Sequence, residues 1–544
     1  MEIIKRHWGL IAVFVLSLFS ILPLFQPGFF PMHDDTQVAR VFEMGKALKD
    51  GMFPVRWVPD LGYGYGYPIF NFYAPLAYYV GGLFTILGFD ALIATKIMMI
   101  VGIVLSGVFM YLLAREFWGE MGGVLSGLFY VYAPYHAVDI YVRGDVAEFW
   151  GYAFIPLMFW GIYKVFDSPR RSPSGRTVWC IPSATFEVNS VWRWVIIGSL
   201  GYAGVILSHN LTAIMATPFL IIVTLLYCYI AYRNKKLSTI YYLLFTILLG
   251  LALSAFYWVP ALLEMKYTNV LSQIGGGADF RDHFVCLGQL WESNWGFGGS
   301  TAGCMLDGMS FVIGKLHIVV PFVVLALVLL FLIKDKNYIV AFLSFAGFAL
   351  SIFFTLEISR FVWETFPTMA FFQYPWRFLI LASFFSSLLS GAIIWFLTIH
   401  LRGVASPGTV RYLASQHLEG GRRDAPDGAS RRTPSRWILM GSFGALIFLL
   451  IFFNSKLFQP QTIVPRTASD YTNEYALKWT ASKISDEFLP PNFKKPKSEH
   501  EIAERPIEFR HTNVQKGSNL ISFIGILVLI AGIIYLRLKR PINE

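Results

Sequence analysis

Apolar runs of about 20 residues recur along the whole chain. A helix needs about 20 apolar residues to cross the hydrocarbon core of a bilayer. The pattern therefore predicts an all-α polytopic membrane protein with about twelve membrane-spanning helices. We expect these spans at 8–28, 93–113, 120–136, 149–166, 194–208, 211–231, 239–260, 316–333, 338–355, 377–399, 437–454 and 519–536.

One further apolar run, "PLAYYVGGLFTILGF" at 75–89, is shorter than the others. Counting it as a span would invert every later loop, because each crossing exchanges the two sides of the membrane. We therefore interpret it as an interfacial or re-entrant segment of the first outer loop.

The positions of the basic residues support this assignment of spans and loops. Cytoplasmic loops are enriched in Lys and Arg, and the basic clusters around Arg115, Arg170, Arg233, Lys334 and Arg422 all fall on one side. Both chain termini are therefore predicted in the cytoplasm. No small-residue cleavage site follows the first run, so we expect a retained helix rather than a signal peptide.

Composition agrees with this class, because 56% of the residues are hydrophobic and only 14% are charged. The net charge of +10 is spread between the apolar runs, which fits control of topology better than nucleic-acid binding. We expect no nucleic-acid partner.

The chain divides into five predicted parts. Residues 1–400 form a transmembrane core with its outer loops, and 401–436 form a basic cytoplasmic linker rich in Arg, Ser, Pro and Gly. Residues 437–454 are one span and 455–517 a small outer segment. Residues 518–544 hold the last span and a cytoplasmic tail.

Four cysteines without a CxxC pair do not form a disulfide scaffold. Cys286 and Cys304 fall in one predicted outer loop, and spacing alone leaves their pairing open.

The first outer loop begins with "FFPMHDDTQVARVF", which places His33, Asp34 and Asp35 just beyond the first span. Apolar residues from 38 to 48 then keep a helical spacing with Arg40 on the opposite side, so a short amphipathic interfacial helix is predicted, ended by Gly51. Either aspartate could cap this helix, and either could instead be chemically active.

The stretch "RWVPDLGYGYGYPIFNFYAP" combines glycines, prolines and tyrosines, including Tyr65 and Tyr67. Such a surface suits a sugar or a lipid headgroup, and an ordinary aromatic belt is the alternative.

The second outer loop, "HAVDIYVRGDVAEFW", carries Arg143, Asp145 and Glu148 at the mouth of a span. Asp145 and Glu148 are three residues apart and so share a helical face. An interface salt bridge to Arg143 is one reading. The surplus of carboxylates also suits acid–base chemistry or a divalent cation such as Mg²⁺ or Mn²⁺, with Asp34 and Glu148 as the ligands if a metal binds.

Two more polar positions interrupt apolar sequence near the same predicted surface. His209 lies in "LSHNLTAIM", where a packing or capping role is the alternative. Trp376 and Arg377 lie in "FFQYPWRFLIL". Arg377 falls on the predicted outer side, although Lys and Arg are usually enriched on the cytoplasmic side, and it could bind a lipid phosphate. Snorkelling of Arg377 to ordinary phospholipid is the alternative reading.

The segments "HDDTQVARVFEMGKALKDGMFPVRW", "DLGYGYGYPIFNFYAPLAYY", "YVRGDVAE", "SHNLTA", "WGFGGSTAGCMLDGMSFVIGKLHI" and "FQYPWRF" resemble a prokaryotic membrane-protein family labelled "6-pyruvoyl-tetrahydropterin synthase-related". The resemblance covers most of residues 1–400. The family is grouped with the GT-C superfamily of polytopic glycosyltransferases, which use lipid-phosphate-linked sugars. No pterin chemistry is expected, because a zinc-binding histidine set is not found.

The resemblance implies an enzyme that moves a sugar from a polyprenyl-phosphate donor to a glycan, lipid or protein acceptor on the outer face of the cytoplasmic membrane. Asp34, with Asp35 beside it, would be the catalytic acid of the first loop, and Glu148 or Asp145 that of the second. Around these carboxylates, the expected substrate-binding residues are His33, Arg143, His209, Arg377, Trp376, Tyr65 and Tyr67.

Two alternatives belong to other classes. A lipid-carrier or polysaccharide transporter would place its ionisable groups near the middle of the membrane in repeated halves, whereas here they crowd one surface. A non-catalytic assembly subunit would leave Asp34, Glu148 and Arg377 far apart.

Overall fold

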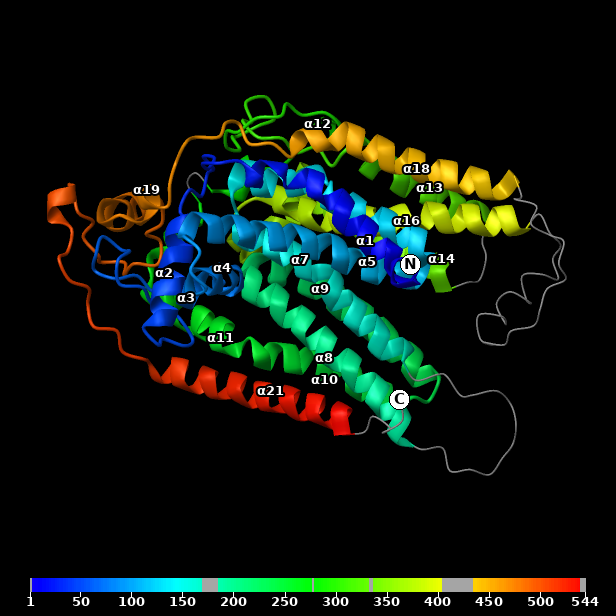
Figure 1. The fold of residues 1–544 in the computed structure, drawn as a ribbon, viewed down its shortest axis with the longest axis horizontal. Helices are drawn as coiled ribbons and strands as arrows, with labels where there is room; N and C mark the ends of the chain where they lie inside the picture. Colours follow the sequence, from blue (N-terminus) through cyan, green and yellow to red (C-terminus); the bar gives the residue numbers. More distant parts are fainter. Residues whose placement is uncertain (1, 169–183, 276–277, 332–335, 404–433, 539–544) are drawn as a thin grey trace.

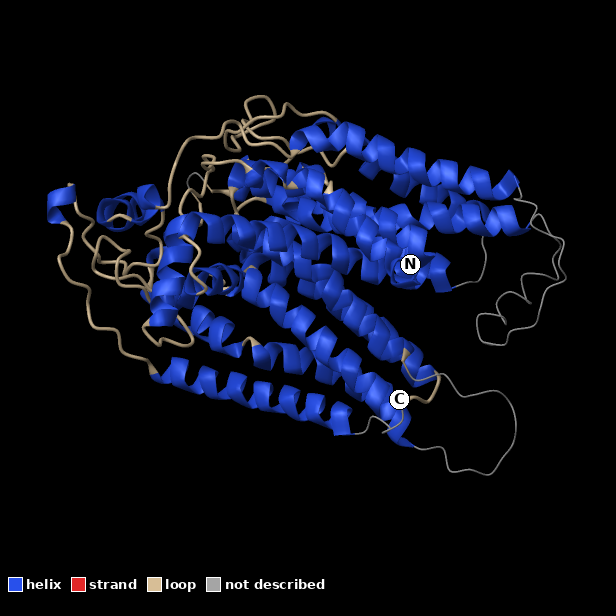
Figure 2. Ribbon diagram, viewed as in Figure 1, coloured by secondary structure: helices blue, strands red, loops and turns tan. Residues whose placement is uncertain are grey.

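The computed structural model describes residues 2–168, 184–275, 278–331, 336–403 and 434–538. These residues form helices, joined by loops in which only isolated β-bridges occur, as the hydropathy pattern predicted (Figure 2). The helices are α1 (Glu2–Ser17), α2 (Gln37–Lys49), α3 (Ile69–Phe72), α4 (Leu76–Ile86), α5 (Ala91–Val131), α6 (Pro134–Val138), α7 (Val146–Asp167), α8 (Ala184–Ser208), α9 (Asn210–Arg233), α10 (Leu237–Leu253), α11 (Ala255–Glu264), α12 (Leu287–Trp291), α13 (Lys315–Phe331), α14 (Lys336–Thr355), α15 (Arg360–Thr365), α16 (Leu379–Gly403), α18 (Pro434–Asn454), α19 (Ser469–Thr472), α20 (Ser482–Ile484) and α21 (Asn513–Leu538).

Several of these helices make the chain an integral membrane protein. Among the described residues, seven helices are long and apolar enough to cross a bilayer, namely α5, α8, α9, α14, α16, α18 and α21. The pair α10 and α11, bent by 67° at Ser254, would make an eighth. Each of the twelve predicted segments overlaps a helix, but a count of twelve spans is not shown.

The difference in number has physical causes. The 41-residue helix α5 would be about 60 Å long if straight, twice the thickness of the hydrocarbon core. It breaks at Gly119, where φ is 72°, and its second half folds back, so that Gly127 faces the carbonyl of Gly107. Two predicted spans therefore count as one helix. In addition, α1 and α13 are short, and the tryptophans and tyrosines of α7 lower its hydropathy.

Helix α4 covers the run at 75–89 and has 11 residues. Its length of about 16 Å is too short to cross the hydrocarbon core, as the sequence interpretation required.

The two chain termini lie at one end of the helix bundle, and α2, α3 and α19 lie at the other (Figure 1). We call the latter the site end. Which end faces the cytoplasm stays a prediction. Most of the predicted linker at 401–436 lies outside the described residues.

Helix α2 matches the predicted interfacial helix in its bounds, and Gly51 follows it with φ +82°. Lys46 and Lys49, also expected on the polar side, are partly or fully exposed, but the expectation for Arg40 is wrong, because Arg40 is only 4% exposed. Its guanidinium lies 4.4 Å from the Tyr73 ring centroid and donates to Ser485 Oγ at 3.0 Å. The 455–517 segment thus covers Arg40, which the helical pattern assigned to the polar side.

The 455–517 segment folds back onto the glycine-rich loop. The amides of Ala503 and Ile507 donate to the carbonyls of Tyr63 and Tyr65 at 2.9 Å each. At Gly64, with φ +78°, a Cβ would lie 2.5 Å from the Ala503 carbonyl oxygen, so only glycine permits this approach.

Between α11 and α13, a disulfide joins Cys286 and Cys304, whose Cα atoms are 6.0 Å apart. This settles the pairing that spacing had left open.

Candidate active site

Backbone hydrogen bonds pin the first loop against the second. The amides of His33 and Asp34 donate to the carbonyls of Val142 and Arg143 at 3.2 and 3.0 Å. The Gln37 side chain donates to the Gly144 carbonyl at 2.7 Å. The start of α2 is therefore fixed beside the second loop, although the two are more than a hundred residues apart in sequence.

The second loop turns sharply before α7. A π-helical turn over Asp139–Arg143 ends at Gly144, which has a left-handed conformation with φ 65°. A Cβ there would lie 2.1 Å from the Sδ of Met32, so the close approach of the first loop also requires glycine. Asp145 then caps α7 by accepting from the Glu148 amide at 3.0 Å.

Arg143 is the centre of a buried cluster of acids. It donates to Asp145 Oδ2 at 2.8 Å and to Glu148 Oε2 at 3.0 Å, and it also pairs with Asp139. Its guanidinium lies 4.7 Å from the Trp376 ring centroid. The salt-bridge reading of Arg143 is correct, but the pairs are buried rather than at an ordinary surface.

Arg377 joins the cluster from the turn that precedes α16. Its Nη1 donates to Glu148 Oε2 at 3.0 Å and lies 3.9 Å from Asp145 Oδ2. Its Nε is buried and has no hydrogen-bond partner among the described residues. Arg377, which lies on the predicted outer side, therefore contacts acidic partners, and its Nε–H donates no hydrogen bond among the described residues.

His209 combines two of its expected roles. It is the N-cap of α9, where its Nδ1 accepts from the Thr212 amide at 3.3 Å. Its Nε2 faces Arg377 Nη1 at 3.4 Å. The capping alternative therefore holds, and the ring still borders the cluster.

Asp34 lies beside this cluster with a partly exposed side chain. Among the described residues, no group donates a hydrogen bond to its carboxylate. Burial raises the pKa of Asp34 to about 6, and the nearby charge of Asp145 adds to this, against the opposing charges of Arg40, Arg143 and Arg377.

The pKa values of the carboxyl groups in and beside the cluster are shifted in opposite directions. Burial would raise the pKa of Asp145, but Arg143, His209 and Arg377 together hold it well below its usual value. Burial and the adjacent Glu148 raise the pKa of Asp139. Asp34 and Asp145 therefore differ strongly in basicity, a division typical of active sites.

Asp35 points to a different partner. It accepts from Arg466 Nη1 at 2.8 Å, and Arg466 also donates to the Tyr471 hydroxyl at 2.8 Å. Neither aspartate caps α2, because its N-cap is Thr36 and no side chain bonds there. The expectation that one of these aspartates caps the helix is therefore wrong, and Gln37, the first residue of α2, bonds to the second loop.

Three predicted binding residues lie around the cluster rather than in it. His33 is exposed, and its Nε2 lies 3.0 Å from the Phe297 carbonyl oxygen. Tyr65 packs edge-on against Phe493 with ring centroids 5.4 Å apart. Tyr67 is buried and accepts from the Phe488 amide at 3.1 Å. The side chains of both tyrosines thus contact the 455–517 segment.

Two members of the cluster were absent from the predicted set. The Tyr135 hydroxyl donates to Glu148 Oε1 and accepts from Arg143 Nη1. Asp139 is four residues before Arg143, a helical spacing that could have indicated the pair. No sequence signal indicates Tyr135.

The cluster includes a group that could hold a metal ion. One ligand atom from each of Asp145, Glu148 and His209 lies within 4.8 Å of the others. Carboxylate and imidazole donors suit a divalent cation. However, Arg143 and Arg377 already contact the same carboxylate oxygens, so a cation would have to displace or repel two guanidinium groups. Asp34, named as a ligand from the sequence, is not in this group.

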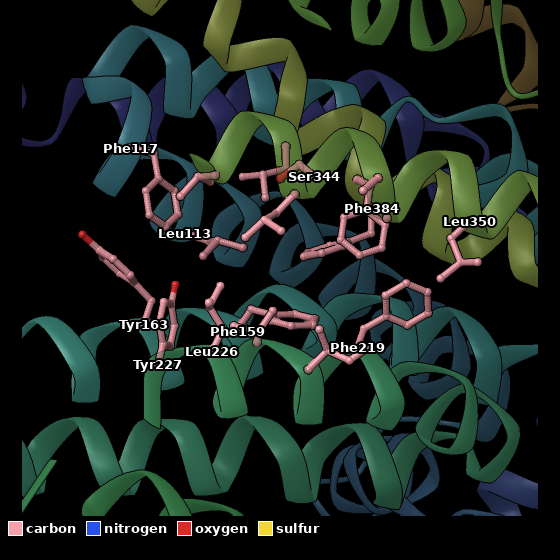
Figure 3. Close-up of a pocket in the computed structure, with 18 residues that line it drawn as sticks. Leu113, Phe117, Phe159, Tyr163, Phe219, Leu226, Tyr227, Ser344, Leu350 and Phe384 are labelled. Carbon is pink, nitrogen blue, oxygen red and sulfur yellow. The ribbon is translucent and has the colours of Figure 1, made fainter. Parts of the chain in front are cut away.

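An apolar cavity of about 220 Å³ lies among α5, α7, α9, α14 and α16 (Figure 3). Phe117 and Tyr163 lie toward one end of the view, and Phe219 and Leu350 toward the other. Phe384, another lining residue, follows Arg377 by seven residues, or about 10 Å along a helix.

No family model matches the chain, so membership of the family described above stays an expectation. An uncharacterized curated protein of Lactococcus lactis subsp. cremoris (strain MG1363) is 24% identical over 264 residues, which cover 47% of this chain. The match spans 39% of the length of that relative.

Two solved structures are similar at 12% identity. The Archaeoglobus fulgidus oligosaccharyltransferase AglB, in complex with an inhibitory peptide and a dolichol-phosphate, has a TM-score of 0.46. The match covers 96% of this chain and 64% of that one. ArnT from Cupriavidus metallidurans, bound to undecaprenyl phosphate, has a TM-score of 0.42, with 88% and 77% covered. Both scores are low, and the function proposed below rests on the site geometry.

Proposed function

We propose that the protein is a membrane glycosyltransferase that moves a sugar from a polyprenyl-phosphate donor to an acceptor hydroxyl at the site end of the bundle. The proposal rests on the positions of Asp34 and Arg377. The Asp34 carboxylate has no hydrogen-bond donor among the described residues, and it lies in the field of Arg377, whose Nε is unused. A base and an anion-binding donor are thus available together.

Asp34 suits the role of general base. A carboxyl group with a pKa of about 6 is ionised at neutral pH and is more basic than an ordinary aspartate. Its partly exposed side chain is accessible to an acceptor, whereas Asp139 and Glu148 are fully buried.

Arg377 suits the role of phosphate ligand. A guanidinium stays charged and can bind phosphate oxygens through several N–H groups. Glu148 holds Nη1 in place, which leaves Nε for the ligand. Asp145 and Glu148 would then act as positioning residues, because their oxygens already hold Arg143 and Arg377.

The proposed reaction is a single displacement. The acceptor oxygen bonds to the anomeric carbon of the sugar while its proton passes to the Asp34 carboxylate. The bond between the anomeric carbon and the phosphate oxygen breaks, and its electron pair leaves with the polyprenyl phosphate. Arg377 stabilises the charge that develops on this phosphate, and the configuration at the anomeric carbon inverts.

The apolar cavity suits the polyprenyl chain of the donor. It is lined mostly by Phe, Leu and Val side chains and lies among five helices, including α16, which follows Arg377 directly (Figure 3). A phosphate at Arg377 would therefore have an apolar volume available along α16 for the isoprene units further down the polyprenyl chain.

If a divalent metal binds, Asp145, Glu148 and His209 would hold it. The ion would supply positive charge for the phosphate, as Arg377 does. We also propose that the site end faces outward, because the chain termini, which the basic clusters of the sequence predict in the cytoplasm, lie at the opposite end (Figure 1).

The test is to incubate the purified protein in nanodiscs with a panel of polyprenyl-phosphate sugars and candidate glycan acceptors. We expect one donor to release polyprenyl phosphate and to yield a glycosylated product with inverted configuration. The same panel in sealed proteoliposomes tests the alternative of a lipid-carrier transporter. Movement of a donor across the membrane without release of polyprenyl phosphate would contradict the proposal.

A further inference from the structure

Four large apolar side chains form an exposed group at the site end. Leu287 and Trp291 on α12 are 71% and 44% exposed, and Met305 and Leu306 in the following hairpin are 92% and 78% exposed. We call these four residues the apolar knob. Exposing so much apolar surface to water is costly, and a group of this kind marks an interaction site.

The knob is held together covalently. Leu287 directly follows Cys286, and Met305 directly follows Cys304, and these two cysteines form the disulfide. Gln289 adds polar contacts, because its side chain donates to Asp307 Oδ2 at 2.8 Å and accepts from the Cys286 amide at 2.9 Å. The exposed side chains are therefore held in position and do not fold inward.

The position of the knob indicates what covers it. The Nζ of Lys315 lies 5.7 Å from the Trp291 ring centroid, and Lys315 is the first residue of the apolar helix α13. Phe322, two turns further along α13, is 55% exposed, so the outward face of this helix is apolar. Tryptophan and lysine at the end of an apolar helix are typical of the membrane interface.

The hairpin that carries the knob also reaches the candidate active site. Its first arm, at 295–299, contacts His33 through the Phe297 carbonyl oxygen at 3.0 Å. Its second arm, at 307–311, places the Phe311 ring 6.0 Å from the Trp376 ring, centroid to centroid. The two arms lie close together, with the Gly298 amide donating to the Gly308 carbonyl at 2.8 Å.

We propose that the apolar knob inserts into the lipid leaflet at the site end of the bundle. The contact of Trp291 with Lys315, at the start of the helix α13 whose outward face is apolar, makes lipid the occupant, rather than a second protein. Insertion would hold the hairpin at the depth of the lipid headgroups, with its base against His33 and Trp376. This interaction does not depend on the proposed sugar transfer.

The test replaces Leu306 by p-benzoylphenylalanine and reconstitutes the protein in nanodiscs that contain an alkyne-tagged phosphatidylcholine. After irradiation, tagged lipid bound to the protein is counted. A matched variant at Leu527, which is 48% exposed on α21, supplies the signal of a lipid-facing position. A variant at the exposed Glu499, far from the termini on the 455–517 segment, supplies the background.

We expect the Leu306 variant to be labelled like the Leu527 variant and at least fivefold above the Glu499 variant. Met305, replaced in the same way, gives a second position. Labelling at the Glu499 level would overturn the proposal. A cross-link to a second copy of the chain in place of lipid would also overturn it.

Discussion

Asp34 and Asp35 are neighbours in the sequence, yet their carboxylates lie in different surroundings. Asp35 is neutralised by Arg466, whereas Asp34 lies beside the buried acids and has no hydrogen-bond donor among the described residues. Burial raises the pKa of both groups. Of the two, only Asp34 leaves its carboxylate without a hydrogen-bonded arginine, and we therefore infer that it is the base.

The pH dependence of the transfer follows from this assignment. A protonated carboxyl group cannot accept a proton, so we expect the rate to fall as the pH drops through about 6, the pKa of Asp34. Above that range the carboxylate is ionised and the rate should level off. Initial rates between pH 4.5 and 8.5 measure the profile. An unchanged rate at the acid end would contradict the assignment.

Even a conservative substitution of Arg377 should lower the rate of transfer. Arg377→Lys keeps a positive charge near Glu148 but removes the unused Nε–H and the planar fork. We expect kcat to fall by about 100-fold, the usual effect of losing one charge-stabilising donor. Arg360→Lys is the matched control, because Arg360 is exposed and pairs with Glu357. Equal rates for the two variants would exclude Arg377 from the phosphate site.

Sequence reasoning located most of the charged residues of the site, because ionisable groups next to apolar runs are conspicuous and a spacing of three or four residues fixes their faces. It missed the pair of Asp35 with Arg466, which are 431 residues apart. Periodicity describes one element at a time and does not indicate which distant loop covers it. Arg40 was placed in solvent for the same reason.

At the scale of elements, the site depends on how two loops approach each other. The amide of Asp34 bonds to the Arg143 carbonyl, and this contact is possible because Gly144 has no side chain beside Met32. A single backbone position thus sets the distance between the proposed base and the acids of the second loop.

We expect Gly144→Ala to lower both stability and activity. The left-handed backbone at φ +65° and the clash with Met32 together should cost about 1–3 kcal/mol, and the displaced Asp34 should slow the transfer. Gly51→Ala is the matched control, because Gly51 has φ +82° but no atom within 4 Å of the added Cβ. Thermal unfolding and the rate of transfer measure both variants, and equal rates would show that the loop contact does not position Asp34.

The helices themselves were predictable, since long apolar runs leave few alternatives in a bilayer. The bend of 67° between α10 and α11 was not predicted. It lies at Ser254, within a run that hydropathy treats as continuous, and Ser522 of α21 bonds to the Phe256 amide just beyond it. A side chain of another helix thus accepts from a backbone amide next to the break, a contact that hydropathy along the chain does not describe.

At the scale of the whole molecule, the proposed site joins a polar cluster to an apolar cavity. This arrangement suits a substrate with a charged head and a long hydrocarbon chain. Hydropathy does not indicate the cavity, because its lining residues come from five helices and look like ordinary core residues.

Filling the cavity should therefore affect long donors more than short ones. We expect Leu350→Trp to raise KM for a polyprenyl donor several-fold while leaving a donor with one or two isoprene units unaffected. Leu350 lines the cavity, and Leu244→Trp, at a comparably exposed position on α10, is the control. If both donors respond equally to Leu350→Trp, the chain does not occupy this cavity.

The most direct measurement compares Asp34→Asn with Asp35→Asn in a single-turnover assay of polyprenyl phosphate release from the donor that the wild-type protein accepts. Both variants remove one carboxylate from adjacent positions. We predict that Asp34→Asn slows release by at least about 100-fold, the usual contribution of a general base, and that Asp35→Asn stays near the wild-type rate. Full activity of Asp34→Asn, or loss of activity in Asp35→Asn alone, would contradict the account.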